Sequence, residues 1–162
     1  MSNLVGKILK GNVQQISKIN VLTTKPDGST SLVELIQCGS PSLSVKFLSQ
    51  ACQSRLCDYI VELVIELGGI TNKFKTIASV DKNCNIQLVE FARYNLIINL
   101  SPLPPLLENL LIECRLIFTK VKGKNEYNLS GNLNGSVIFS FQGIKNEIND
   151  ATIVKGGTFT LN

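Results

Sequence analysis

The stretch from Asp58 to Val80, DYIVELVIELGGITNKFKTIASV, decides the fold class of this chain. Apolar residues occupy every second position from Tyr59 to Leu67, which is the pattern of a strand with one apolar face. Gly68 and Gly69 then interrupt the run, and paired glycines suit the short turns that join antiparallel strands. A second alternating run follows the glycines. The stretch therefore predicts a long β-hairpin.

The residues before this hairpin change period. Apolar side chains recur there every three or four positions, which is the spacing of an amphipathic helix seated on one face. The recurring residues are Val45, Leu48, Cys52 and Leu56. This stripe can be continued through Tyr59–Leu67, but the β-branched residues and the strict alternation there favour a strand. We therefore predict a helix over about 44–57, followed by a strand.

The segment after the hairpin, residues 86–100, alternates again, with Glu90 as the exception on its apolar face. A run of this length exceeds the usual strand of about three to ten residues, so we expect a bulge near Glu90–Arg93. Three prolines within 102–105 end the strand, because proline cannot donate to a ladder. Pro105 suits the first turn of a helix, which predicts a short helix over about 105–111.

The rest of the chain consists of short alternating runs separated by turns such as Lys25-Pro26-Asp27-Gly28. A length of 162 residues fits one domain. The sequence thus predicts a single, mainly β domain over residues 1–162, with the middling helix and the short helix added to its strands. An antiparallel meander is expected to form either a barrel or a sandwich, and the sequence leaves that choice open.

Composition excludes several classes of protein. Hydrophobic residues make up 44% of the chain and charged residues 17%, so a disordered chain is excluded. The net charge is +4, and the arginines are confined to Arg55, Arg93 and Arg115. Because arginine supplies the fork that recognises phosphates and bases, so few arginines make nucleic acid an improbable partner.

The cysteines and the N-terminus bear on localisation. Five cysteines, an odd number, are dispersed along the chain, so we expect free and mostly buried thiols. The first residues lack the apolar core of a signal peptide, and no run approaches the ~18 apolar residues that span a membrane. These features predict a cytoplasmic protein without a membrane span.

Missing histidine removes most familiar catalytic chemistry. The chain has no His, which excludes Ser-His and Cys-His nucleophile pairs and His-containing metal sites. Cys52 and Cys57 could form half of a thiolate metal site, but no second pair completes four ligands. The glycine pairs precede strands, whereas a phosphate loop must open a helix. We predict no catalytic residue, no cofactor and no metal, and therefore no enzyme.

Residues of the expected inner face could line a ligand cavity. Aromatic side chains beside small residues leave room for a hydrophobic or aromatic small molecule, and an inward Glu90 would meet its polar group. A bulge that turns Glu90 to solvent is the alternative. The candidate lining residues are Glu90, Ala92, Tyr94, Phe118, Tyr127, Gly131, Phe139 and Phe141.

The opposite face of the strands carries more apolar residues than a wetted face needs. Single exposed apolar residues are normal, but this number suggests a covering layer, either the predicted helix, a second sheet or a subunit interface. The candidate interface residues are Ile60, Val64, Ile77, Val89, Phe91, Ile97, Ile117 and Val121.

Three functions follow from these patterns. The first is a structural or assembly subunit that associates with copies of itself or with a protein partner. The second is a small barrel carrier for a hydrophobic ligand. The third is weak binding of single-stranded nucleic acid along Lys120, Lys122 and Lys124 beside Tyr127, although lysines that guard a solvent-facing turn explain that cluster better.

Overall fold

The computed structural model describes residues 3–14, 18–37, 42–53, 56–67, 69–98, 100–101, 106–141 and 143–162. Side chains are described within these ranges except at 14, 18, 35–37, 53, 56, 67, 90–92, 94–101, 106–110, 141 and 150. The regular structure of the described part consists of strands alone, and none of it is a helix long and apolar enough to cross a membrane. The strands are β1 (Ile8–Gln14), β2 (Lys18–Thr24), β3 (Thr30–Gln37), β4 (Ser42–Gln53), β5 (Leu56–Leu67), β6 (Ile70–Val80), β7 (Ile86–Ile98), β8 (Leu100–Ser101), β9 (Leu106–Lys120), β10 (Glu126–Phe141) and β11 (Ile144–Leu161).

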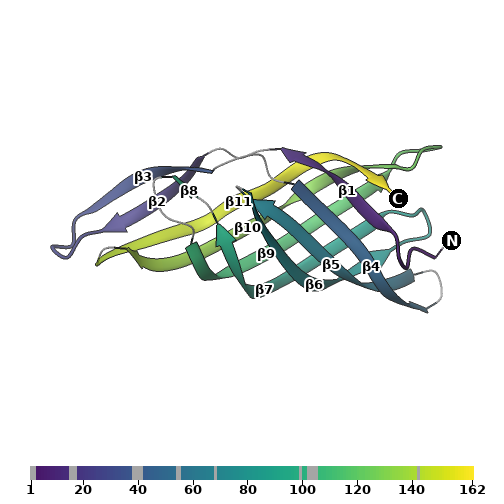
Figure 1. Ribbon diagram of the computed structural model, residues 1–162, viewed down its shortest axis with the longest axis horizontal. Helices are drawn as coiled ribbons and strands as arrows, with labels where there is room; N and C mark the ends of the chain where they lie inside the picture. Colours follow the sequence, from purple (N-terminus) through teal and green to yellow (C-terminus); the bar gives the residue numbers. More distant parts are fainter. Residues whose placement is uncertain are drawn as a thin grey trace.

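Eight of these strands close into an antiparallel barrel (Figure 1). The sheet runs in the order β1-β4-β5-β6-β7-β9-β10-β11, and β11 pairs back onto β1. Strands that neighbour each other in the barrel mostly follow each other in sequence. The exceptions are the hairpin of β2 and β3, inserted between β1 and β4, and the short β8 between β7 and β9. The predicted barrel is therefore present, and the sandwich is not.

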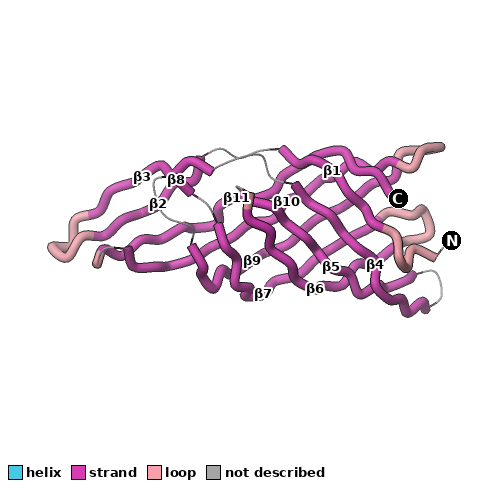
Figure 2. Tube along the Cα trace, viewed as in Figure 1, coloured by secondary structure: helices cyan, strands magenta, loops and turns pink. Residues whose placement is uncertain are grey.

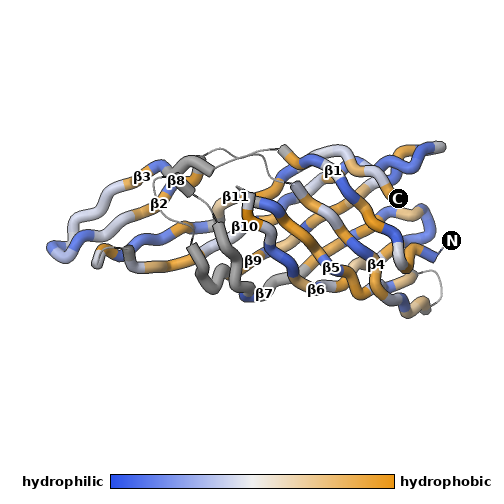
Figure 3. The backbone as a smooth tube through the Cα atoms, viewed as in Figure 1, coloured by the Kyte–Doolittle hydropathy of each residue, from blue (hydrophilic) through white to orange (hydrophobic). Residues whose placement is uncertain are grey.

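The hairpin predicted over Asp58–Val80 is formed by β5 and β6. Its register runs without interruption from the Cys57–Val80 pair to the Leu67–Ile70 pair, and Gly69 takes a positive φ of 80° in the turn. Alternate residues of β5 point into the barrel and are buried. Figure 3 shows hydrophobic and hydrophilic stretches interspersed along the strands of the barrel. The inward residues include Tyr59, Val61, Leu63 and Ile65.

An arm formed by β2 and β3 extends beyond the barrel (Figure 2). The long strand β11 carries it, because β11 pairs with β2 at Lys145–Glu147 before its last residues pair with β1. One side of β3 pairs with β2, and its other side pairs with β8 at Ile36 and Gln37. Leu32, nearer the tip, is 73% exposed. This part of β3 is thus an edge strand with an exposed apolar side chain.

Two glycines allow the barrel to close between β1 and β11. A Cβ atom on Gly11 would lie 2.3 Å from the carbonyl oxygen of Thr158. A Cβ atom on Gly157 would lie 2.4 Å from the carbonyl oxygen of Asn12, and Gly157 also takes a positive φ of 133°. Real Cβ atoms do not approach other atoms so closely, so the two backbones meet at this distance because neither position has a side chain.

The predicted helix over 44–57 is wrong, because residues 42–53 form β4 and residues 56–67 form β5. The spacing that suggested a helix comes from a β-bulge. The register between β4 and β5 shifts between Phe47 and Ser49, so Leu48 is an extra residue. An extra residue moves the following side chains to the opposite parity, so Val45 and Cys52 fall on the same face of β4 although they are an odd number of residues apart.

The short helix predicted over 105–111 is also wrong. Residues 106–120 form β9, whose first residues pair with the end of β7, as in the Ile98–Leu106 pair. The predicted bulge near Glu90–Arg93 is absent as well, because the register between β7 and β9 is unbroken from Ile86 to Ile98. Pairing along the whole of β9 supports a strand longer than the usual length, so no bulge is needed to divide it.

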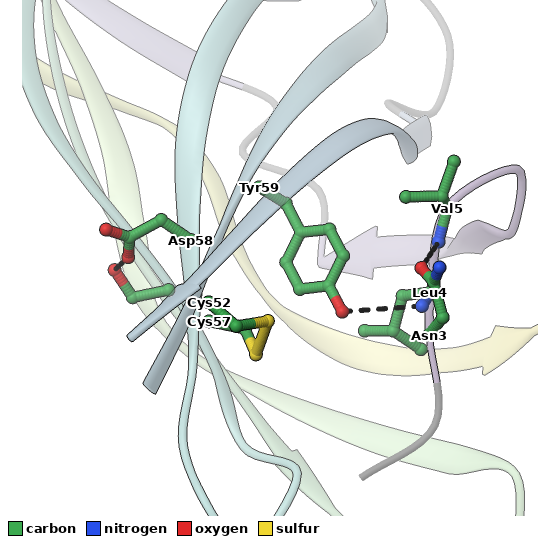
Figure 4. The surroundings of a disulfide bond; sticks show 8 residues. Asn3, Leu4, Val5, Cys52, Cys57, Asp58 and Tyr59 are labelled. Atoms are coloured by element: carbon green, nitrogen blue, oxygen red, sulfur yellow. Dashed lines mark hydrogen bonds between the residues drawn. A yellow bond between two sulfur atoms is a disulfide. The ribbon is translucent and has the colours of Figure 1, made fainter. Parts of the chain in front are cut away.

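Two of the cysteines form a disulfide, which corrects the expectation of free thiols throughout (Figure 4). Cys52 and Cys57 are partners in the register of β4 and β5, with their Cα atoms 4.0 Å apart, and their sulfurs are bonded. Cys84 and Cys114 are not disulfide-bonded, whereas Cys38 lies outside the described residues. The disulfide joins the end of β4 to the start of β5.

Replacing both cysteines, Cys52→Ser with Cys57→Ser, is expected to lower the free energy of unfolding by about 2 kcal/mol, because the unfolded chain gains the freedom of a small closed loop. Urea unfolding without reductant measures this loss. The matched control is Cys84→Ser, which leaves the disulfide in place. If the denatured, unreduced wild-type chain shows as many reactive thiols as the reduced chain, the disulfide is absent and the prediction is contradicted.

Candidate functional site

Side chains fill the described part of the barrel interior. Phe118, Tyr127 and Phe139, which were predicted to line a ligand cavity, are all buried among core residues. The Phe118 ring packs edge-on against Phe159, with ring centroids 5.0 Å apart, and Phe47 packs in the same way against Tyr59 at 5.2 Å. The interior of an eight-stranded barrel is just wide enough for such filling. These aromatics therefore act as core residues rather than as walls of a cavity.

The structure describes the burial of one of the remaining predicted lining residues, Gly131. Gly131 is exposed at a register shift of β10, and a Cβ atom there would meet the carbonyl oxygen of Arg115 at 2.1 Å. The backbones of Glu90 and Ala92 are in register with the buried residues Cys114 and Ile112. The side chains of the last four predicted residues lie outside those that the structure describes: Glu90, Ala92, Tyr94 and Phe141.

The end of the barrel near the termini holds the lysine cluster that was considered for nucleic acid. The Nζ atom of Lys120 lies 5.9 Å from the centroid of the Tyr127 ring and donates a 2.6 Å hydrogen bond to the carbonyl oxygen of Lys124. Burial, with a smaller repulsion from Cys84, raises the pKa of Tyr127 above 10.0 and favours the neutral phenol. Lys120 is thus engaged in holding the turn, and these contacts give it a structural role.

The N-terminal segment covers the same end of the barrel, next to the end of β4 and the start of β5, and its Leu4 lies near Lys120 and Tyr127. The backbone N–H of Leu4 donates a 3.4 Å hydrogen bond to the hydroxyl of Tyr59, and Leu4 itself is buried. Figure 4 shows the Tyr59 phenol pointing toward Leu4 from beside the disulfide. Asp58, which points outward, accepts a 2.8 Å hydrogen bond from the hydroxyl of Ser79 on β6. These contacts secure the wall next to the predicted interface residues.

Three predicted interface residues lie side by side on the outside of the barrel. Ile60 on β5 is in register with Ile77 on β6, and Val89 on β7 continues the line because it follows Leu88, the partner of Ala78. Their exposed fractions are 49%, 58% and 61%. We call Ile60, Ile77 and Val89 the outer row. Their exposure shows that no helix or second sheet among the described residues covers it.

A shallow hollow and a set of charges flank the outer row. The hollow, of about 160 Å³, lies between β4 and β6 and is lined in part by Ala51, Ile60 and Ile77. Two residues further along the strands, Glu62 is in register with Lys75 on one side and with Lys46 on the other. The row is therefore an apolar strip with a recess at one end and both signs of charge alongside.

The other predicted interface residues do not extend the outer row. Val64, Ile117 and Val121 are half-buried, so each presents less apolar surface. The side chains of Phe91 and Ile97 lie outside those that the structure describes. The structure thus brings together three of the eight predicted residues and leaves the others apart or untested.

Sequence analysis missed a second feature of the outer surface. A groove of about 420 Å³ lies across β7, β9, β10 and β11, with Arg93 at its side. In the sequence Arg93 stands out as one of three arginines, but the groove depends on a register shift between β10 and β11. The buried positions of β11 change parity there, from Asn146 and Ile148 to Ile153, but the alternation of one strand does not identify the strand that pairs with it.

No known protein family, curated protein or solved structure matches this chain. Function must therefore be argued from the residues. No group of three or more His, Cys, Asp or Glu side chains is placed to hold a metal ion among the residues described.

Phe118→Ala is expected to lower the free energy of unfolding by about 3–5 kcal/mol, because truncating a packed ring leaves a cavity in the core. Ile77→Ala, on the exposed outer row, is the matched control and is expected to change it by less than about 1 kcal/mol. Urea unfolding of the two variants measures both values. Equal, small losses would show that Phe118 lines open space and would restore the carrier hypothesis.

Proposed function

We propose that this barrel is an assembly subunit that associates with a second copy of itself through the outer row. The observation that carries this proposal is that Ile60, Ile77 and Val89 are contiguous, apolar and about half exposed or more. Scattered apolar residues are ordinary on protein surfaces, whereas a contiguous strip marks a contact. The closed sheet supports it further, since no free strand of the barrel wall can fold over the strip.

The shape of the strip is complementary to itself. When two copies face each other, a two-fold axis can lie between them, parallel to β6. This axis brings Ile77 of one copy against Ile77 of the other and places β5 of one copy over β7 of the other. Val89 of one copy then faces Ile60 of the other, beside the hollow lined by Ala51. A projecting side chain thereby meets a recess, as an interface between identical surfaces requires.

The charges beside the strip fit the same arrangement. The axis along β6 brings the two Lys75 side chains together and places one Glu62 on each side of them. The charges of the two Lys75 and the two Glu62 side chains cancel, and Lys46, in register with Glu62 on β4, lies on the outer side of each pair. Like charges alone would oppose the contact, so the Glu62–Lys75 register removes an obstacle to pairing of identical copies.

The size of the strip sets the strength of the association. Three side chains supply far less than the roughly 800 Å² per partner of a standard stable interface. The expected complex is therefore weak and depends on concentration. Exposed ion pairs add specificity more than affinity, because solvent screens them.

Ile77→Lys is expected to abolish self-association, because the contact would bury an unpaired charge from each copy at its centre. Sedimentation velocity over a concentration series into the high micromolar range measures the effect, with wild type shifting toward a dimer. The matched control is Leu32→Lys, which puts the same charge at another exposed apolar position, on the edge of β3.

Three results would contradict the proposal. One is a wild-type chain that stays monomeric across the series. Another is association of Ile77→Lys that matches wild type. The third is loss of association in Leu32→Lys but not in Ile77→Lys, which would place the contact at the edge of β3.

A further inference from the structure

A groove on a different part of the outer surface combines an apolar floor with one positive charge. It crosses the barrel wall where Arg93 on β7 is in register with Leu111 on β9, and Leu111 with Ser136 on β10. Its volume is about 420 Å³, within the range of roughly 300–1,000 Å³ found for small-molecule sites. It is separate from the outer row, whose residues do not line it.

A β-bulge produces the groove. Gly135 is paired with Ala151 and Val137 with Ile148, so Ser136 stands opposite two residues of β11 instead of one. The unequal count bends the strands and interrupts the ladder. As a result Val137 and Ile148, which belong to the inner core, also form part of the groove floor.

The groove is apolar apart from its rim. Leu111, Val137 and Ile148 contribute to the floor, and Ile138, which is 63% exposed, stands at the side. Ser136 and Asn149 add polar groups. An alkyl chain placed along this surface would remove apolar area from water on both partners, at about 25 cal/mol per Å².

Arg93 supplies the charge. It is exposed, and it has no hydrogen bond or ion pair with any residue that the structure describes. A guanidinium presents a planar fork of donors that matches a carboxylate in two parallel hydrogen bonds. Arg93 is therefore available to an anion that enters the groove.

The neighbouring acids limit the anion to a single charge. Glu113 occupies the outer face two residues from Leu111, and Glu147 is in register with Ile138. Glu147 is paired with Lys145 at 2.9 Å, so this lysine is already engaged. Among the side chains that the structure describes, a nucleic acid or polyphosphate would meet the Arg93 guanidinium and two carboxylates, whereas a monocarboxylate needs only the guanidinium.

We propose that this groove binds an amphipathic monocarboxylate, with its carboxylate on Arg93 and its hydrocarbon chain over Leu111 and Ile138. This binding is independent of self-association, because it uses other residues. It also differs from the carrier hypothesis, because the ligand lies outside the barrel and leaves the packed interior undisturbed.

Isothermal titration with decanoate below its micellar concentration tests the proposal. Wild type is expected to bind decanoate at a single site, and Arg93→Gln to weaken binding about tenfold or more, the loss of one charge-assisted contact. The matched control is Arg115→Gln, an exposed arginine on the outer face of β9 that does not line the groove. It is expected to leave decanoate binding within about twofold of wild type.

A second probe distinguishes the contribution of the carboxylate to binding from that of the hydrocarbon chain. Decyltrimethylammonium carries the same chain with the opposite charge, and it is expected not to bind. The proposal is overturned if wild type does not bind decanoate, if Arg93→Gln and Arg115→Gln weaken it equally, or if the cationic probe binds as well. Circular dichroism of both variants verifies their fold, and titration of Ile77→Lys shows whether binding persists when self-association fails.

Discussion

The close approach of β1 and β11 at Gly11 and Gly157 is the constraint on which the rest of the structure depends. Carbonyl oxygens occupy the space that a Cβ atom would need at either position. At one end of the same seam, Ile8 and Asn162 exchange two backbone hydrogen bonds of 2.9 Å. Closure here turns a long sheet into a barrel and gives every strand of the wall an inside and an outside. Without this seam the sheet would be open, and its apolar inner face would have no opposite wall to pack against.

Closure also explains why apolar residues remain on the outside. Strand geometry lets each residue face either the core or the exterior, and the core already takes the inward positions of β5 and β6. Ile60 and Ile77 have the opposite parity, so the fold cannot bury them, and only another molecule can. Bulges change parity locally, and each has a consequence. The extra residue at Leu48 changes which side chains of β4 face outward beside the hollow. At Ser136, one residue of β10 stands opposite two of β11, and this bulge forms the groove next to Arg93.

Sequence alone predicted the features that arise within one strand or one turn. The hairpin of β5 and β6 and the outward parity of Ile60, Ile77 and Val89 follow from alternation, and the structure confirms them. Features that depend on pairing between strands were missed or misjudged. The bulge at Leu48 changed the spacing of apolar residues to one that resembles a helix. Pairing with β7 extends β9 over residues predicted to be helical. The Cys52–Cys57 bond depends on the register of β4 and β5. Phe118 and Tyr127 were correctly expected inside, but whether they fill or line a barrel depends on its width, which no single strand specifies.

Native-state hydrogen exchange of the seam tests the central claim, the closure of the barrel, most directly. If β1 and β11 complete the wall, the hydrogen-bonded amides of β1 and of the last residues of β11 exchange as slowly as those of β5, because they open only when the whole barrel unfolds. Exchange of the seam amides more than about a hundredfold faster than that of β5, a local opening that costs about 3 kcal/mol less, would contradict it. In that case the sheet would be open at β1 and β11, and the account of the inner and outer faces would fail with it.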